Sequence, residues 1–243
     1  MRIAATLGLS ALGSVGAVLV ASLFLLVGER GRSRVLPSLI SYAVGTLLGA
    51  ALLGLLPEAL ETRSPSQVFA SLLVGIFTFF ILEKLVLWRH CHDTAECQVH
   101  RSTATLVIVG DAFHAMVDGA VIAAAVVVSL PLGITTALAI AAHEVPQQVG
   151  DVAILLAAGY SRSKALALNL VSGLSSLAGA ALMLLFAEAT PSILGYVLGF
   201  AAGNFLYVAM ADLIPHLHRG MEETSAVRQT VMIAAGIATI LAL

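Results

Sequence analysis

Hydrophobic residues recur along this chain in eight long runs that are separated by short polar segments. A helix needs roughly 20 apolar residues to cross the hydrocarbon core of a bilayer. We place the runs at residues 3–27, 36–60, 68–88, 103–129, 132–158, 164–188, 192–217 and 226–243. The pattern predicts an all-α integral membrane protein, an eight-transmembrane-helix bundle that forms a single transmembrane domain over residues 1–243.

The composition also indicates a membrane protein, and the distribution of charge predicts how the helices are oriented across the membrane. Charged residues make up 11% of the chain, against about 25% in a soluble domain. Nine Lys and Arg residues fall in or directly beside connections on one side of the predicted bundle, whereas Arg2 and Arg63 fall on the other. Because cytoplasmic loops carry the excess of basic residues, both termini are predicted to lie outside (N-out/C-out), in the inner cell membrane. The small, dispersed net charge of −2 argues against nucleic acid as a partner.

The fourth and fifth runs carry ionisable side chains at positions that fall deep in the membrane. Such groups are costly in hydrocarbon, so they usually serve a function. Residues three, four, seven or eight apart share a face of a helix, and both runs have polar residues at these spacings. The faces consist of Asp111, His114 and Asp118 in the fourth run, and of His143, Gln147 and Asp151 in the fifth, with Glu144 beside them.

The connection between these two runs is only a few residues around Pro131, so they are antiparallel neighbours whose polar faces meet near mid-membrane. Imidazole nitrogens and carboxylate oxygens together suit zinc, and they also accept iron, manganese or cadmium. The predicted ligands are His114, Asp118, His143 and Glu144, with Gln147 as a weak ligand. Candidate pathway residues are Asp111, Asp151, Glu58, Asp212, His216, His218, His90, Cys91 and His92.

Prolines inside three of the runs predict irregular helices. Pro146 removes the helical partner of the Ala142 carbonyl, so the helix is expected to kink and to expose that carbonyl beside His143. Pro57 and Pro215 occupy similar places in the second and seventh runs. Broken helices around a midplane site are typical of transporters.

Small residues in the second and sixth runs predict that helix backbones approach closely at surfaces that slide during transport. These residues are Gly45, Gly49 and Gly54 in the second run, and Gly173, Ser176, Gly179 and Ala180 in the sixth.

The connection at residues 89–102 holds His90, Cys91, His92 and Cys97 on the predicted cytoplasmic side. Thiols stay reduced there, so a structural disulfide is disfavoured. The spacing is not that of a closed structural zinc site. Transient binding of a thiophilic metal and a plain solvated loop are equally consistent with these residues.

Together these motifs resemble the ZIP (Zrt/Irt-like) family of divalent metal transporters over nearly the whole chain. His114 to Gly119 is similar to the family's HNxxDG motif, and His143 to Asp151 to its HExPxxxGD motif, as in one branch of the family and its bacterial relatives. Further similarity covers Gly45 to Ala59, Phe79 to His92 and Gly203 to Pro215.

The resemblance implies eight spans, a transport site between the fourth and fifth, movement of zinc or a similar ion toward the cytoplasm, and a homodimer. This chain also departs from the family patterns, and each departure removes a ligand or a charge. These departures therefore favour a site for one metal ion over a site for two. The departures are Ala115, Gln147, Gln148, Ala50, Gly54 and His216.

Two other classes of function use similar residues. An ion channel has the same polar faces, and the sequence alone does not separate it from a carrier. An intramembrane metalloprotease is suggested by His143-Glu144, which begins like the zinc-binding HExxH helix. That motif requires a second histidine where Gln147 stands and a regular helix where Pro146 stands, so the chain is predicted not to be an enzyme.

Overall fold

The structure is a computed structural model that describes residues 2–24, 26, 29–88, 99–219 and 226–243. Each of the eight predicted runs overlaps a helix, and within the described residues all regular secondary structure is helical. The long helices are α1 (Arg2–Phe24), α2 (Glu29–Gly49), α4 (Pro65–Trp88), α5 (Val99–Val128), α6 (Leu130–Ala157), α7 (Arg162–Ala189), α8 (Leu194–Tyr207) and α10 (Ala226–Leu241). Shorter elements are η1 (Ala50–Leu55), α3 (Leu56–Thr62), η2 (Pro191–Ile193), η3 (Val208–Leu213) and α9 (Ile214–Arg219).

Six helical segments in the described part of the chain are long and apolar enough to cross a membrane. They are Arg2–Leu23, Val35–Thr62, Pro65–Lys84, Ile108–Val128, Arg162–Ala189 and Pro191–His218. Helix α6 has 28 residues, about 42 Å at 1.5 Å per residue, but it carries the polar run from His143 to Asp151. Helix α10 has 16 residues and is shorter than a typical span.

The outward faces of these helices are strongly apolar, as expected of a surface covered by lipid. Leu73 and Phe77 on α4 are 64% and 60% exposed, and Leu185 on α7 is 65% exposed. Most of the buried polar residues, in contrast, lie inside the bundle on α1, α5, α6 and α7. A soluble protein rarely exposes so much contiguous apolar surface, so the chain is a multi-pass membrane protein.

The breaks predicted near Pro57 and Pro215 take the form of π-helical turns. The six-residue segments η1 and η3 end two residues before these prolines. After them, the N–H of Leu56 donates to the Ala51 carbonyl, and the N–H of Ile214 to the Ala209 carbonyl, five residues back in each case. The wider turn supplies backbone partners next to a residue that has no N–H of its own.

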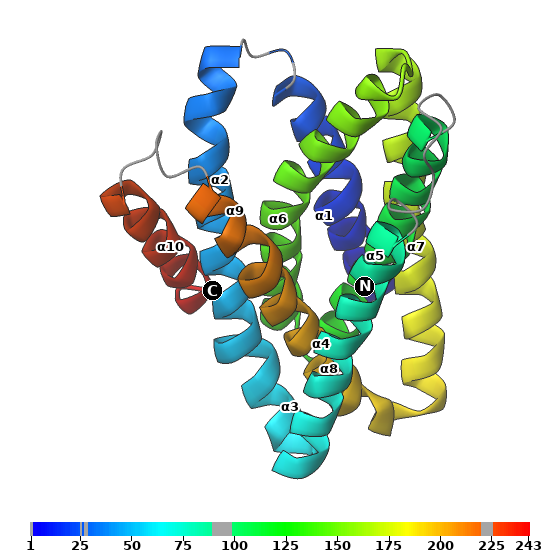
Figure 1. Ribbon diagram of the computed structural model, residues 1–243. Helices are drawn as coiled ribbons and strands as arrows, with labels where there is room; N and C mark the ends of the chain where they lie inside the picture. Colours follow the sequence, from blue (N-terminus) through cyan, green and yellow to red (C-terminus); the bar gives the residue numbers. More distant parts are fainter. Residues whose placement is uncertain (1, 25, 27–28, 89–98, 220–225) are drawn as a thin grey trace.

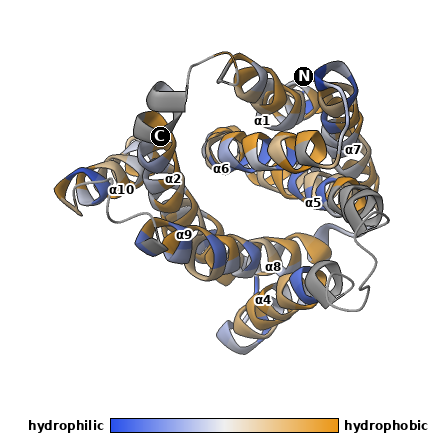
Figure 2. Cartoon of the chain, turned by 45° about the horizontal axis from the view of Figure 1, so that its top comes forward, coloured by the Kyte–Doolittle hydropathy of each residue, from blue (hydrophilic) through white to orange (hydrophobic). Residues whose placement is uncertain are grey.

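The helices fall into two groups that face each other across the molecule. Helices α1, α5, α6 and α7 pack together in one group, and α2, α3, α4, α8, α9 and α10 in the other (Figures 1 and 2). Contacts between the groups run mainly from α6 to α2 and η1 and from α5 to α8.

A tight turn fixes α5 and α6 as antiparallel neighbours, as the short connection predicts. The Ser129 side chain caps α6 by accepting a hydrogen bond from the N–H of Leu132, 3.3 Å away. Gly159 supplies the positive φ of the turn after α6, and Ser161 then caps α7. These turns hold the polar faces of α5, α6 and α7 at a common depth.

Candidate metal site

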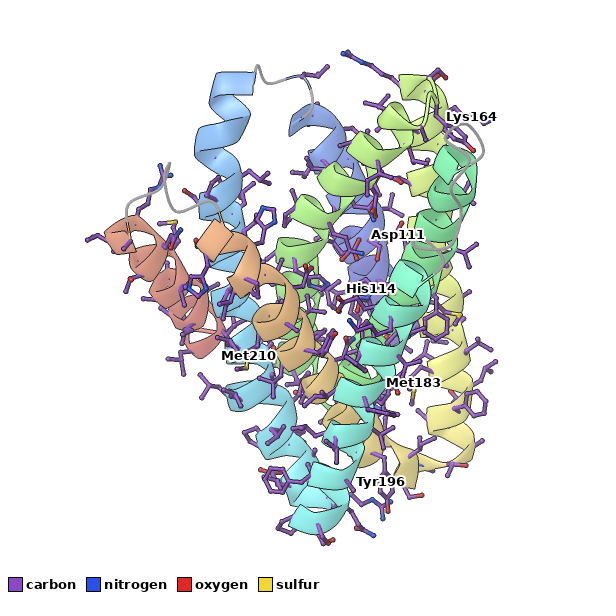
Figure 3. The ribbon with its side chains drawn as sticks, in the orientation of Figure 1. Asp111, His114, Lys164, Met183, Tyr196 and Met210 are labelled. Carbon is purple, nitrogen blue, oxygen red and sulfur yellow. The ribbon has the colours of Figure 1, made fainter. Side chains whose placement is uncertain are left out.

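Four predicted ligands meet in one buried cluster between α5 and α6. One ligand atom from each of His114, Asp118, His143 and Glu144 lies within 4.8 Å of the other three. All four side chains are buried, and Asp118 and Glu144 are 0% exposed. Figure 3 places His114 and the neighbouring Asp111 at mid-height, between Lys164 near one end of the bundle and Tyr196 near the other.

The spacing of these atoms approaches that of a tetrahedral zinc site. The two Nε2 atoms of His114 and His143 are 3.2 Å apart. Nε2 of His114 lies 3.6 Å from Oδ2 of Asp118 and 3.5 Å from Oε1 of Glu144, and Nε2 of His143 lies 3.5 Å from Oδ2 of Asp118. Bonds of about 2.0–2.1 Å to zinc put tetrahedral ligands about 3.3 Å apart. Four of the six ligand pairs are therefore close to the required separation.

Three of the four ligand atoms, from Asp118, His143 and Glu144, are placed as acceptors. Nδ1 of His143 lies 3.1 Å from the Ala139 carbonyl, which favours the tautomer with the proton on Nδ1 and the lone pair of Nε2 directed at the cluster. Among the described residues, no hydrogen-bond donor reaches either carboxyl oxygen of Asp118 or Oε1 of Glu144. Converging buried acceptors are unfavourable by themselves, and a cation relieves them.

A hydrogen-bonded network supports the cluster from the side of α7. The Gln148 amide donates to Oε2 of Glu144 at 3.0 Å and to Oδ1 of Asp111 at 3.1 Å. Ser172 donates to the other oxygen of Asp111, and the Asn169 amide donates to the Gln148 carbonyl at 3.4 Å. Asp111 thus belongs to the support of the cluster and lies outside the four-ligand set.

Two aromatic rings from the opposite helix group pack against the imidazoles. The ring of Phe79 on α4 lies edge-on to His114 with centroids 5.4 Å apart, and Phe205 on α8 lies 6.1 Å from His143. The cluster is therefore carried by α5 and α6, and its far wall comes from the other helix group.

A cavity of about 420 Å³ adjoins the cluster. In α5 its wall includes Gly110 and His114, and in α6 it includes Gln147 and Asp151. Because α5 and α6 are antiparallel, these positions all lie on one side of the cluster, toward the start of α5 and the end of α6, which share an end of the molecule in Figure 1. The remaining lining residues are Phe79, Leu82, Glu83, Phe113, Tyr207, Val208 and Asp212.

The opposite side of the cluster is filled by apolar side chains. Ile122 of α5, Ile140 of α6 and Leu55 of η1 are each 0% exposed and belong to the main hydrophobic core. Glu58 lies beyond this core, in a separate pocket of about 270 Å³ that also contains Glu61. The cluster thus has a cavity on one side and packed core on the other.

Among the described residues, the other predicted Asp, Glu and His residues lie outside the four-residue cluster. Gln147 lines the cavity together with Asp151 and Asp212. His216 and His218 are exposed on α9. The histidines and the cysteine predicted at residues 90–92 lie outside the described residues.

Two features of α6 add to what its sequence suggests. The helix is continuous from Leu130 through Pro146 to Ala157, so the kink at Pro146 stays a prediction, and Nδ1 of His143 pairs with the Ala139 carbonyl one turn earlier. Gln148, which looks like a lost ligand in the motif, is completely buried and holds two carboxyl groups. Its position four residues after Glu144 was the signal for this contact.

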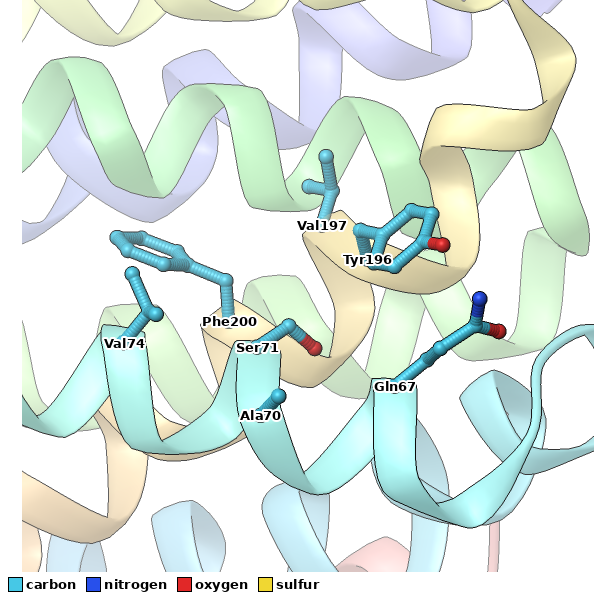
Figure 4. Close-up of a pocket in the computed structure, with 7 residues that line it drawn as sticks. All are labelled: Gln67, Ala70, Ser71, Val74, Tyr196, Val197 and Phe200. Atoms are coloured by element: carbon cyan, nitrogen blue, oxygen red, sulfur yellow. The ribbon is translucent and has the colours of Figure 1, made fainter.

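A second cavity, of about 520 Å³, lies between α4 and α8 and has a different character (Figure 4). Its wall is almost entirely apolar and contains no imidazole or carboxyl group. Val74 in this wall is 57% exposed, so the cavity opens on the outer, apolar surface of the bundle. It has none of the chemistry of a metal site. Its lining residues are Gln67, Ala70, Ser71, Val74, Tyr196, Val197 and Phe200.

A buried site of two imidazoles and two carboxyl groups in a polytopic helical bundle is the arrangement of a membrane transporter for divalent metals. Residues 89–243 match the sequence profile of the ZIP zinc transporter family. The chain belongs to this family.

Named relatives agree with this assignment. Zinc transporter ZIP13 of Pongo abelii is 35% identical over an alignment of 221 residues, and the match covers 83% of this chain and 65% of that protein. Zinc transporter ZIP13 of Homo sapiens is 30% identical over 88% of this chain and 71% of its own length. Zinc transporter ZIP10 of Danio rerio is 38% identical over 50% of this chain, but only 14% of that protein is covered. The chain thus spans about two thirds of the ZIP13 proteins and far less of ZIP10.

Proposed function

We propose that this protein carries a divalent transition-metal ion, zinc in the first place, across the membrane toward the cytoplasm. The observation that carries the proposal is the set of four buried ligand atoms on α5 and α6. Four of the six distances between these atoms are 3.2–3.6 Å, close to the edge of a zinc tetrahedron. The named relatives are zinc transporters, which supports zinc ahead of iron, manganese or cadmium.

The direction rests on charge and on the position of the cavity. We infer eight spans in one transmembrane domain, with both termini outside, because the basic residues cluster in alternate connections. In this orientation the start of α5 and the end of α6 face the cytoplasm, and the 420 Å³ cavity lies on that side of the cluster. The apolar core closes the outer side. The conformation described is then one in which an ion leaves inward.

The residues around the cluster take separate parts in this mechanism. Glu58 in the outer pocket attracts the cation at the entrance, and the four ligands replace its water near the midplane. Gln147, Asp151 and Asp212 line the way out. Transport requires that the cluster becomes accessible from the outer side in a second conformation.

The proposal also includes that the protein forms a homodimer in the inner cell membrane.

Uptake into vesicles tests this function. The purified protein is reconstituted, and zinc, iron, manganese and cadmium uptake are compared for the parent, His143→Ala and Asp118→Ala. Each variant removes one ligand and leaves the others buried without compensation. Uptake is expected to fall at least about 100-fold, because changing a residue that only supports a ligand often costs 10- to 100-fold.

Thr136→Val is the matched control, because Thr136 is a fully buried polar residue on α6 whose hydroxyl has no hydrogen-bond partner among the described residues. It is expected to transport as the parent does. Undiminished uptake by both ligand variants would refute the proposed site. Uptake that does not saturate at high zinc would favour a channel.

A further inference from the structure

The Gln148 side chain is buried, although the sequence motif presents it only as the loss of a ligand. It is 0% exposed, and it projects from α6 one turn after Glu144. Its amide nitrogen donates to Oε2 of Glu144 and to Oδ1 of Asp111, at 3.0 and 3.1 Å. An amide nitrogen has two hydrogens, and both are used here.

The orientation of this amide is fixed by its surroundings. Reversing it would place the carbonyl oxygen against two carboxyl oxygens, which also accept hydrogen bonds. Ser172 holds the second oxygen of Asp111, and Asn169 donates to the backbone carbonyl of Gln148. Side chains from α5, α6 and α7 therefore hold the amide in one position.

Through this amide, Gln148 determines how Glu144 faces the ligand cluster. One oxygen of Glu144 accepts from Gln148, and the other, Oε1, lies 3.5 Å from Nε2 of His114. Among the described residues, no donor satisfies Oε1. Rotation of the Glu144 carboxyl group, which would withdraw Oε1 from the cluster, would break the hydrogen bond to Gln148.

The same geometry bears on how many ions the buried site holds. Carboxyl groups from two helices, Asp111 and Glu144, point at a common position, and a cation commonly fills such a position. Here an N–H donor fills it, with partial positive charge and no need of a metal. A carboxyl group at position 148 would instead bring a third set of oxygens to this point.

We propose that the Gln148 amide stands in the place of a second cation: it is a positioning residue that orients Glu144 and limits the buried site to one divalent ion. The inference rests on the proposed function, because it concerns the same ligand cluster. Its distinctive consequence is that a single substitution at position 148 changes the number of ions bound.

Zinc binding to the full chain in lipid nanodiscs tests the inference. Equilibrium dialysis gives the number of zinc ions per chain and the dissociation constant. The parent is expected to bind one ion, and Gln148→Met one ion about 10- to 100-fold more weakly, the usual loss for a residue that supports a ligand. Gln148→Glu is expected to bind two ions, and the double variant Gln148→Glu with Asp111→Asn is expected to bind one.

Two controls separate this inference from the proposed function. Gln67→Glu adds the same charge on α4, in the apolar cavity of Figure 4, and is expected to bind one ion with parental affinity. His143→Ala removes a ligand and is expected to lose the first ion.

If the parent binds zinc, His143→Ala does not, and Gln148→Glu still binds one ion, the inference is wrong and the proposed function stands. The inference is equally wrong if Gln148→Met binds as tightly as the parent, and this measurement decides the matter where Gln148→Glu does not fold. A parent that binds no zinc overturns both.

Discussion

Gly119→Ala tests whether the packing of α5 against α7 sets the geometry of the metal site. A Cβ atom on Gly119 would lie 1.8 Å from the carbonyl oxygen of Ser176 and 2.6 Å from its carbon, whereas ordinary contact begins near 3.4 Å. The obstacle is backbone, so the two helices must separate by about 1.6 Å in this direction rather than let one side chain turn aside.

The cost of this movement has two parts. Overpacking in a well-packed core costs about 1–3 kcal/mol, and a backbone clash belongs at the upper end. The hydrogen bond from Ser175 to the Ala112 carbonyl, 2.5 Å long, crosses the same interface and would be stretched. A loss of about 3 kcal/mol corresponds to a fall in melting temperature of about 6–12 °C for a chain of this size. Asp118 precedes Gly119, so zinc affinity should fall as well.

Gly150→Ala is the matched control. Nothing lies within 4 Å of a Cβ at this position on α6, and alanine is favoured over glycine in a helix by about 1 kcal/mol. Thermal unfolding of both variants in nanodiscs, with and without zinc, makes the comparison. If Gly119→Ala melts at the temperature of Gly150→Ala and binds zinc equally well, the argument from helix packing is refuted.

Three further outcomes follow from the structure. Val208 lies in the cavity wall, so Val208→Cys in a background without the native cysteines should react with an impermeant maleimide added from the cytoplasmic side. Ser176 is fully buried, so Ser176→Cys should not react. Equal labelling of the two variants would contradict the cavity. Zinc affinity measured by dialysis should fall between pH 7.5 and 5.5, because protons compete with the metal for imidazole, and a constant affinity would argue against histidine ligands. Arg63→Ala removes a cation–π contact of 4.7 Å with Tyr196, worth about 0.5–2 kcal/mol, so the melting temperature should drop by a few degrees and Arg63→Lys should restore only part of the loss.

Hydropathy predicted the helices well because the length of an apolar run is set by the membrane rather than by tertiary packing. Each of the eight predicted runs overlaps a helix of the structure. The ends of the helices depend on local caps, and so α7 begins two residues earlier than expected, directly after Ser161. The π-helical form of η1 and η3 was not predictable from Pro57 and Pro215, because a proline specifies a missing donor but not how the backbone compensates.

The composition of the cluster was predictable for a similar reason. Helical spacing and a short connection are local properties, and together they bring the His114 and His143 faces to the same depth. The small and polar residues of the sixth run mark the face of α7 that carries Asn169 and Ser172, because they recur at helical spacing. The contacts of these two side chains were not predictable, because the sequence does not show which helices that face packs against.

Two of the glycines that the sequence suggested as sliding surfaces, Gly45 and Gly179, lie instead in close contacts between helix backbones. Three helix pairs have a glycine on each partner, and a Cβ on either glycine would lie 1.8–2.4 Å from a backbone oxygen of the other helix. The pairs are Gly119 of α5 with Gly179 of α7, Gly75 of α4 with Gly203 of α8, and Gly45 of α2 with Gly236 of α10.

Backbones in such close contact resist sliding, because every small shift meets another carbonyl. Each pair lies within one of the two helix groups. The contacts between the groups, in contrast, include rings such as Phe79 and Phe205 against the two imidazoles. Side chains of this kind can repack by changing rotamers. We therefore expect the change of access to occur between the groups, with the cluster moving as part of α5 and α6.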